Sequence, residues 1–129
     1  MIHVKAVVKG EPDTPPFMMV FQYTDKSDEL VFYNSVKMVR EKLAKNLKIN
    51  TNEALVIYCA YVVSAVRAHE SVSKIESDGS KILSDKEVMI GVPETLSKVT
   101  FEATIDNFSK KQISFDNPIL ITSPRINLY

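Results

Sequence analysis

The chain has 129 residues, enough for one domain that buries about two-thirds of its unfolded surface. Its 16 basic and 16 acidic side chains give a formal net charge of zero, which argues against a general nucleic-acid binder or a protein of membrane surfaces. A single cysteine excludes an internal disulfide, and no charged segment precedes an apolar run at the start, so we expect a soluble cytoplasmic protein.

The first 24 residues predict two β-strands. Residues 2–9 alternate between two faces over most of their length, and residues 17–23 form a second apolar run. The prolines and the glycine of segment 10–16 interrupt regular structure between them. We therefore expect the two strands to pair across a long turn and to form a β-rich N-terminal extension, residues 1–24.

A long amphipathic helix is expected next. Ser27 is a suitable N-cap, with acidic residues in the first turn where the helix dipole favours them. Apolar residues then follow at helical spacing, at Phe32, Val36, Val39, Leu43 and Leu47. The lysines near its end, Lys42, Lys45 and Lys48, indicate a solvated end that complements the dipole, and an anion-binding or partner-binding end is the alternative.

The segment 54–66 is apolar at every position but Ser64. Its β-branched residues and tyrosines leave helix and strand open, but the start signal favours a helix. Asn50 is a suitable N-cap with Glu53 three positions later, which is the spacing of a capping box. The run is too short to cross a bilayer, which takes roughly 20 residues. We predict a buried central helix that its neighbours cover on every side.

A short helix is expected after the central one. Ser71 or Ser73 can cap its start, and Gly79 is expected to end it.

A second short helix is expected from Ser84. Glu87 lies three positions later, again at capping-box spacing, and the helix would run through 88–90. Gly91 is a natural residue after a helix end, and Pro93 cannot continue the helix but can open a final turn.

The C-terminal part predicts an antiparallel β-hairpin. Residues 99–105 alternate without interruption, and Ile113 and Phe115 resume the alternation after a connecting segment. Segment 119–121 could add a further short strand before a C-terminal tail, 120–129. The order of elements predicts an α+β fold: a small helical bundle around a buried central helix, with a C-terminal antiparallel β-hairpin and an N-terminal β appendage.

The sequence contains little that could carry catalysis. The two histidines, His3 and His69, are far apart, and neither has a ligand-like partner at helical or loop spacing. The three glycines are too scattered for a phosphate-binding loop, and Cys59 lies in the central apolar run, where a packing role is expected. We therefore predict a binding or structural module with no catalytic, cofactor-binding or metal-binding residues.

An ordered series of short motifs resembles the urease gamma subunit family. It covers about residues 25–119 and comprises Leu47-Lys48-Ile49-Asn50 with Glu53-Ala54, Arg67 with Ser71-Val72, Gly79 with Ile82-Leu83, Val88-Met89-Ile90-Gly91-Val92-Pro93-Glu94, Glu102-Ala103-Thr104 and Asn117-Pro118-Ile119. The segment 88–94 is the most specific of these. The predicted domains are thus an N-terminal extension, 1–24, a gamma-like domain, 25–119, and a tail, 120–129.

This resemblance implies a non-catalytic structural subunit of a urea-hydrolysing assembly. The resemblance places the nickel pair and its ligands in a large alpha subunit and implies alpha and beta subunits as partners of this chain. The residues expected at an interface or in a family motif are Asn50, Glu53, Arg67, Val88, Met89, Gly91, Val92, Pro93, Glu94, Glu102, Asn117 and Pro118. The alternative is a stand-alone homo-oligomeric gamma-like module with a different interaction or regulatory role.

The chain also departs from the family pattern. Thr51-Asn52 replaces a Tyr-Pro pair, Ala68-His69 replaces Asp-Gly, and Asp116 replaces the histidine before the closing Asn-Pro-Ile. The hairpin turn that begins at Asp106 is about one residue longer, and residues 1–24 have no counterpart in the common gamma chain.

Overall fold

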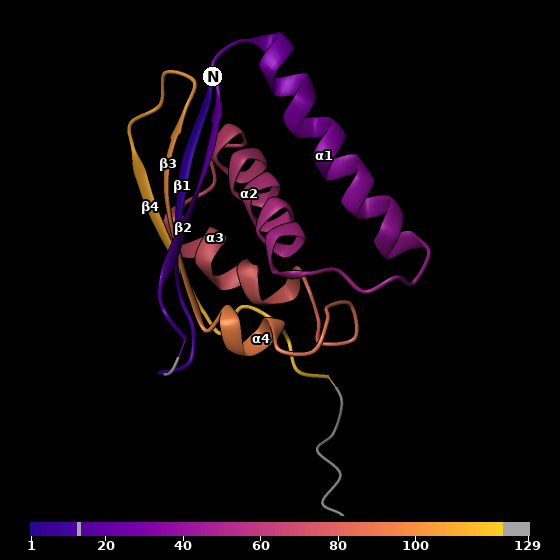
Figure 1. Cartoon of the computed structure of the whole chain (residues 1–129). Coiled ribbons are helices and arrows are strands. Elements are labelled where there is room, and N and C mark those ends of the chain that lie inside the picture. The colour runs from indigo at the N-terminus through magenta and orange to yellow at the C-terminus, as the bar shows by residue number, and fades with distance from the viewer. Residues whose placement is uncertain (13, 123–129) are drawn as a thin grey trace, which may run out of the picture.

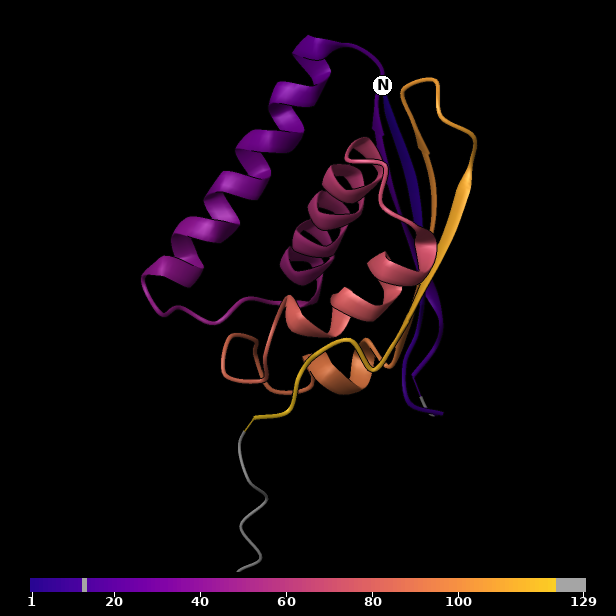
Figure 2. The same ribbon diagram turned by 180° about the vertical axis from the view of Figure 1, so that it is seen from behind.

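A four-stranded antiparallel sheet with helices on one of its faces forms the molecule (Figures 1 and 2). The computed structural model describes residues 1–12 and 14–122, so the end of the predicted tail, 123–129, lies outside the described residues. The elements in chain order are β1 (Ile2–Lys9), β2 (Phe17–Tyr23), α1 (Lys26–Ala44), α2 (Thr51–Arg67), α3 (Val72–Asp78), the 3-10 turn η1 (Gly79–Lys81), α4 (Val92–Thr95), β3 (Lys98–Ile105) and β4 (Lys111–Asp116). The predicted α+β class is confirmed.

The sheet has the strand order β2-β1-β3-β4. Both predicted hairpins form, because β1 pairs with β2 and β3 pairs with β4. The sequence did not predict that they share one sheet: β1 also pairs with β3 in a register that sets Ile2 opposite Ile105 and Val8 opposite Val99. Alternate residues of β1 and β3 point to the helices and are fully buried, as the alternation requires.

The helix α2 lies between α1 and the sheet (Figures 1 and 2). The predicted capping box is present: the Glu53 amide donates to Asn50 Oδ1 at 2.8 Å, and the Asn50 amide donates to Glu53 Oε1 at 3.0 Å. Ten of its 17 residues are buried, among them Tyr58, Cys59 and Val62. The prediction of a buried central helix is confirmed.

The N-cap of helix α1 lies two residues before the predicted one. Asp25, not Ser27, is the N-cap, because its extended backbone lets its carboxylate accept the Asp28 amide at 2.8 Å. Phe32, Val36 and Val39 of the predicted stripe are buried and Leu43 is half-buried, whereas Leu47 lies beyond the helix end and is 52% exposed.

The predicted short helix at 84–90 is wrong, because these residues form a turn. The Ser84 amide donates to Glu87 Oε1 at 2.9 Å, which is half of the expected capping box, but no helix follows. Instead, the Ile49 amide donates to the Glu87 carbonyl at 3.0 Å and the Met89 amide donates to the Ile49 carbonyl at 2.9 Å. Ile49, which is distant in sequence, thus supplies backbone hydrogen bonds that a helix would otherwise have formed within the segment.

The helix α3 begins at Ser71, whose hydroxyl accepts the Lys74 amide at 3.2 Å, so Ser73 lies inside the helix. Gly79 follows α3 and opens η1. A Cβ at Gly79 would lie 2.3 Å from the ring of Phe115, so only glycine fits against β4 there. The possible short strand at 119–121 does not form: Leu120 makes only an isolated β-bridge to Ser84.

Candidate functional site

The predicted site residues do not converge on one point. The structure brings together the loop 88–94 and the segment Asn117-Pro118, whereas Asn50 and Glu53 lie at the start of α2 and Arg67 lies at its end. Glu102 lies on the open face of the sheet, where it pairs with Lys110 at 3.5 Å. Apart from Glu102, the predicted residues therefore lie on or next to three separate surfaces.

The first surface is the motif loop, which we define as residues 88–94. Val88 and Val92 are buried and anchor the loop in the core, while Met89 is 45% exposed and Ile90 is fully exposed. Gly91 has φ +92°, a left-handed conformation that other residues rarely adopt, and it caps α4. A firmly anchored loop thus presents two large apolar side chains to solvent.

A shallow hollow of about 200 Å3 adjoins this loop. It is lined by Glu11, Pro93, Glu94, Asn117, Ile119 and Ile121. Backbone hydrogen bonds hold its walls, from the Glu11 amide to the Glu94 carbonyl at 3.1 Å and from the Asn117 amide to the Ser97 carbonyl at 2.6 Å. Asn117 has φ +46°, which asparagine tolerates better than most residues. The hollow therefore joins the two predicted motifs into one surface.

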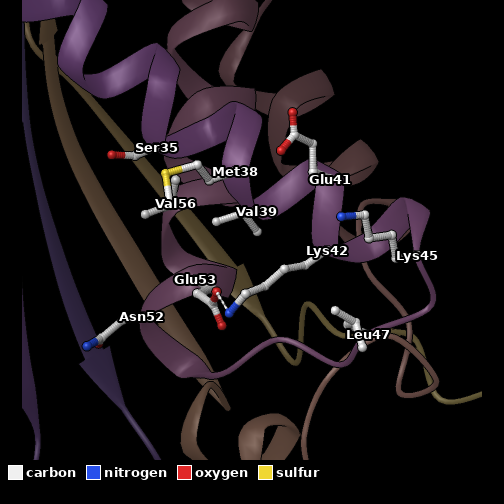
Figure 3. Close-up of a pocket in the computed structure, with 10 residues that line it drawn as sticks. All are labelled: Ser35, Met38, Val39, Glu41, Lys42, Lys45, Leu47, Asn52, Glu53 and Val56. Atoms are coloured by element: carbon white, nitrogen blue, oxygen red, sulfur yellow. Dashed lines mark ion pairs between the residues drawn. The ribbon is translucent and has the colours of Figure 1, made fainter.

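The second surface is a groove of about 390 Å3 between α1 and α2 (Figure 3). Its lining residues are Ser35, Met38, Val39, Glu41, Lys42, Lys45, Leu47, Asn52, Glu53 and Val56. Met38 is 67% exposed, so an apolar side chain borders the groove on the side of α1. Of this set, the sequence indicated Glu53 as a motif residue, and Lys42 and Lys45 as part of a helix end for which anion or partner binding was the alternative. The sequence pattern of α1 does not indicate what covers its exposed apolar residues.

An ion pair closes the end of this groove, where Lys42 Nζ lies 2.6 Å from Glu53 Oε2 (Figure 3). Burial pushes the pKa of Glu53 upward, but the hydrogen bonds from Lys42 and from the Asn50 amide hold that pKa below its usual value. Glu53 thus completes the capping box of α2 and also pairs with Lys42 of α1, so one carboxylate links the two helices.

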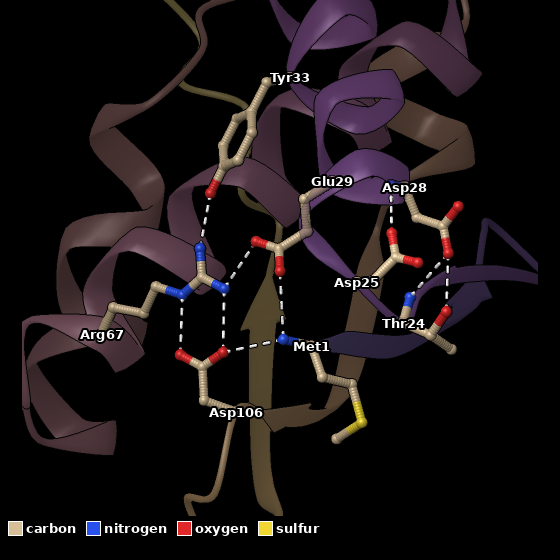
Figure 4. A network of polar contacts seen from close by, with 8 residues as sticks. All are labelled: Met1, Thr24, Asp25, Asp28, Glu29, Tyr33, Arg67 and Asp106. Atoms are coloured by element: carbon tan, nitrogen blue, oxygen red, sulfur yellow. Dashed lines mark hydrogen bonds and ion pairs between the residues drawn. The ribbon is translucent and has the colours of Figure 1, made fainter.

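The third surface is a polar network around Arg67, the last residue of α2 (Figure 4). Its guanidinium donates to both carboxylate oxygens of Asp106, from Nε at 3.0 Å and from Nη2 at 3.1 Å. Nη2 also donates to Glu29 Oε1 at 2.8 Å, and Nη1 donates to the Tyr33 hydroxyl at 2.7 Å. The α-ammonium of Met1 donates to Glu29 and Asp106 at 3.1 and 3.0 Å.

The charges in this network shift one another. The hydrogen bonds from Arg67 and then from the α-ammonium lower the pKa of Asp106 to about 2, and the bond from Arg67 lowers the pKa of Glu29 despite its burial. The same bonds raise the pKa of the Arg67 guanidinium and of the Met1 ammonium. All four groups are therefore charged at neutral pH, and the network holds α1, α2 and the β3–β4 turn together.

Across residues 1–12 and 14–122, no group of three or more His, Cys, Asp or Glu side chains is placed to hold a metal ion. Cys59 is fully buried, and burial raises the pKa of its thiol. The His69 ring packs edge-on against Phe108 at 5.0 Å. None of the helices in the described part of the chain is both long and apolar enough to span a membrane.

Two kinds of comparison with known proteins point to the same family. The family model described as "Urease, gamma subunit" matches residues 19–119. A urease subunit gamma from Halalkalibacterium halodurans is 32% identical over 94 residues, which cover 73% of this chain and 93% of that protein. The family match thus contains α1, α2, the motif loop and the C-terminal hairpin, and begins inside β2.

Proposed function

Because the chain belongs to the urease gamma subunit family, we propose that it is a non-catalytic structural subunit of a urease, a complex that hydrolyses urea. In this proposal the chain supports assembly with a large alpha subunit and a beta subunit in the cytoplasm. The nickel of such a complex is expected in the large subunit. The observation that carries the proposal is the match over 101 residues, 19–119, which includes every predicted motif.

The motif loop is the surface that best suits a partner. Ile90 is fully exposed although the residues around it are fixed by the bridge between Ile49 and Val88 and by the buried Val92. Exposed large apolar side chains on a rigid scaffold are typical of residues that a partner covers, since binding them costs little ordering entropy. The hollow beside Pro93 and Asn117 adds depth to this surface.

A co-expression experiment tests this role. The full chain, produced together with the alpha and beta subunits of a urease, is expected to co-elute with them on a sizing column and to raise urea hydrolysis. Ile90→Asp should lower recovery of the complex at least tenfold, because a charge at a covered apolar contact is strongly unfavourable. Leu30→Asp is the matched control: Leu30 is 64% exposed, in the first turns of α1, whose start lies at the opposite end of the molecule from α4 (Figure 1).

Two results would contradict the proposal. If the wild-type chain does not associate with these subunits and their activity is the same without it, the chain is not a structural subunit of that enzyme. If Ile90→Asp and Leu30→Asp both leave the complex intact, the motif loop is not the contact surface.

A stand-alone gamma-like module with a different interaction or regulatory role is the second candidate. The observation in its favour is that β1, in the middle of the sheet, lies outside the residues that match the family. A stable homo-oligomer that binds neither urease subunit would support this candidate over the first.

A further inference from the structure

The two edges of the sheet differ in how they are protected. The edge strand β4 has Lys111 and Asp116 at its ends, and Glu76 of α3 accepts the Ser114 amide at 2.7 Å. The other edge strand, β2, has no charged residue, no proline and no glycine over Phe17–Tyr23. Natural sheets usually protect an edge with charges, prolines or covering elements. The edge of β2 has none of these devices.

The hydrogen-bonding groups on the free edge of β2 follow from the sheet register. The Asp106 amide donates to the Met1 carbonyl at 2.8 Å, so the odd-numbered residues of β1 bond to β3 and the even-numbered ones bond to β2. The partners of those even residues are the odd residues of β2. The amides and carbonyls of Met18, Val20 and Gln22 therefore point away from the sheet, and within the described residues none has a backbone partner.

The side chains of β2 are also incompletely covered. On the open face, Met18 and Val20 are 59% and 54% exposed. On the helix-facing side, Phe17, Met19 and Tyr23 are only half-buried, whereas their neighbours in β1 are fully buried. An additional strand beside β2 would cover both faces.

We propose that the free edge of β2 is a strand-addition site for a second copy of this chain, which extends the sheet across a two-fold axis at Val20. An antiparallel β2–β2 pair centred on Val20 sets Val20 opposite itself and Met18 opposite Gln22. These three residues are the ones whose backbone groups point outward, so each of the three pairs exchanges two hydrogen bonds and all outward groups of Met18, Val20 and Gln22 are satisfied.

The same register suits the side chains. On the helix-facing side it sets Met19 opposite Phe21 and Phe17 opposite Tyr23, which gives cross-strand pairs of large apolar residues at the junction. Because β2 contains no charged residue, two copies of the strand can pair without charge repulsion between them. The segment is therefore complementary to itself, which is what an isologous interface between identical chains requires.

The size of the edge limits the expected affinity. Seven residues extend about 24 Å, and such a strand edge covers less than the roughly 1,600 Å2 of a standard stable interface. We expect a dimer with a dissociation constant in the micromolar range, visible as a concentration-dependent rise in mass by analytical ultracentrifugation of the full chain alone.

Charge substitutions at the axis test the proposal. Val20→Lys and Val20→Glu should each weaken self-association at least tenfold, because two like charges meet at the two-fold axis. An equimolar mixture of the two variants should recover association. Thr104→Lys, on the open face of β3, should associate like the wild type. A chain that stays monomeric at all concentrations, or single variants that still dimerise, would overturn the proposal.

A cysteine pair tests the register. Residues in a hydrogen-bonded antiparallel pair have Cα atoms about 5.5 Å apart, within the range of a disulfide. Val20→Cys should therefore form a covalent dimer under mild oxidation, while Gln22→Cys alone should not, and the buried Cys59 should not react. Equal cross-linking of both variants would overturn the register. The absence of a covalent homodimer of Val20→Cys would overturn the proposal and would be the result expected if a strand of another subunit binds at this edge.

Discussion

At the scale of single residues, Arg67 connects parts of the chain that are far apart in sequence. It joins the end of α2 to Glu29 in the first turn of α1 and to Asp106 after β3. The Glu29 side chain is only 12% exposed, so its carboxylate depends on Arg67 and on the Met1 ammonium for compensation. A cation removed from such a site leaves a desolvated charge, which costs more than the pair itself contributes.

Replacement of this cation gives the first prediction. Arg67→Met should lower the free energy of unfolding by about 1–3 kcal/mol at pH 7, because Glu29 loses its strongest partner. Urea-induced unfolding of both proteins measures the difference. An Arg67→Lys variant should recover part of the loss, since an ammonium restores the charge but not the two-pronged contact with Asp106.

The pKa shift of Asp106 adds a dependence on pH to this prediction. Its folded-state pKa of about 2 lies below its ordinary value of 3.8, so its contribution is fully present above about pH 4 and is lost as the pH falls towards 2. Wild-type stability should therefore decrease over this range more steeply than that of Arg67→Met. Parallel curves for the two proteins would contradict the assigned cause of the shift.

The hydroxyl of Tyr58 is the opposite case, a polar group without compensation. Tyr58 is fully buried, and across residues 1–12 and 14–122 its hydroxyl is the buried side-chain polar atom that has no hydrogen-bond partner. Tyr58→Phe should therefore raise the free energy of unfolding by about 1 kcal/mol. The thermal midpoint measures this change, and a lower midpoint would indicate a bridging partner in solution.

At the scale of elements, α2 and the segment 84–90 show when a local signal is sufficient. Both carry capping-box spacing, at Asn50 and Glu53 and at Ser84 and Glu87. In α2 the signal precedes a long apolar run in which ten residues are buried, so local and tertiary preferences agree. At Ser84 only a few residues remain before Gly91, and pairing with Ile49 supplies the hydrogen bonds instead. A capping signal predicts a helix reliably only where the segment that follows it is long enough to form one.

The burial of α2 leads to a prediction for that helix. Val62→Asp should abolish soluble folding, because Val62 is fully buried and an unpaired charge there costs several kcal/mol. Tyr58→Asp should have the same effect. Ser64→Asp is the matched control, since Ser64 is exposed on the same helix, and it should change stability by about 0.5 kcal/mol or less. Soluble expression and circular dichroism distinguish the variants.

At the scale of the whole molecule, the strand order could not be read from the sequence. Each hairpin follows from local alternation, but the pairing of β1 with β3 joins residues separated by all the helices. The same limit applies to the site. The motif loop and Asn117 were found by resemblance, whereas the groove between α1 and α2 arises from the packing of two helices, which no short segment encodes.

The central position of β1 gives a prediction for the whole chain. Deletion of residues 1–24 should prevent cooperative folding, because it removes two strands and uncovers the buried edge and core face of β3, including Phe101. Val4→Asp should act likewise, whereas Lys9→Asp at the exposed strand end should not. A soluble fragment 25–129 with a sharp thermal transition would contradict this expectation. It would instead support the predicted division into an extension and a gamma-like domain, 25–119.

The place of β1 between β2 and β3 also determines the order of events during synthesis. β1 leaves the ribosome before the other strands of the sheet, yet its second neighbour, β3, is complete only when Ile105 has emerged. Until then the β1–β2 hairpin has an unpaired backbone edge on each side, and the helices have no complete sheet to pack against. Closure of such a long loop is slow, so the joining of β1 to β3 is expected to limit the folding rate. The nascent chain is therefore most exposed to aggregation, and most in need of chaperones, in the interval between these two strands.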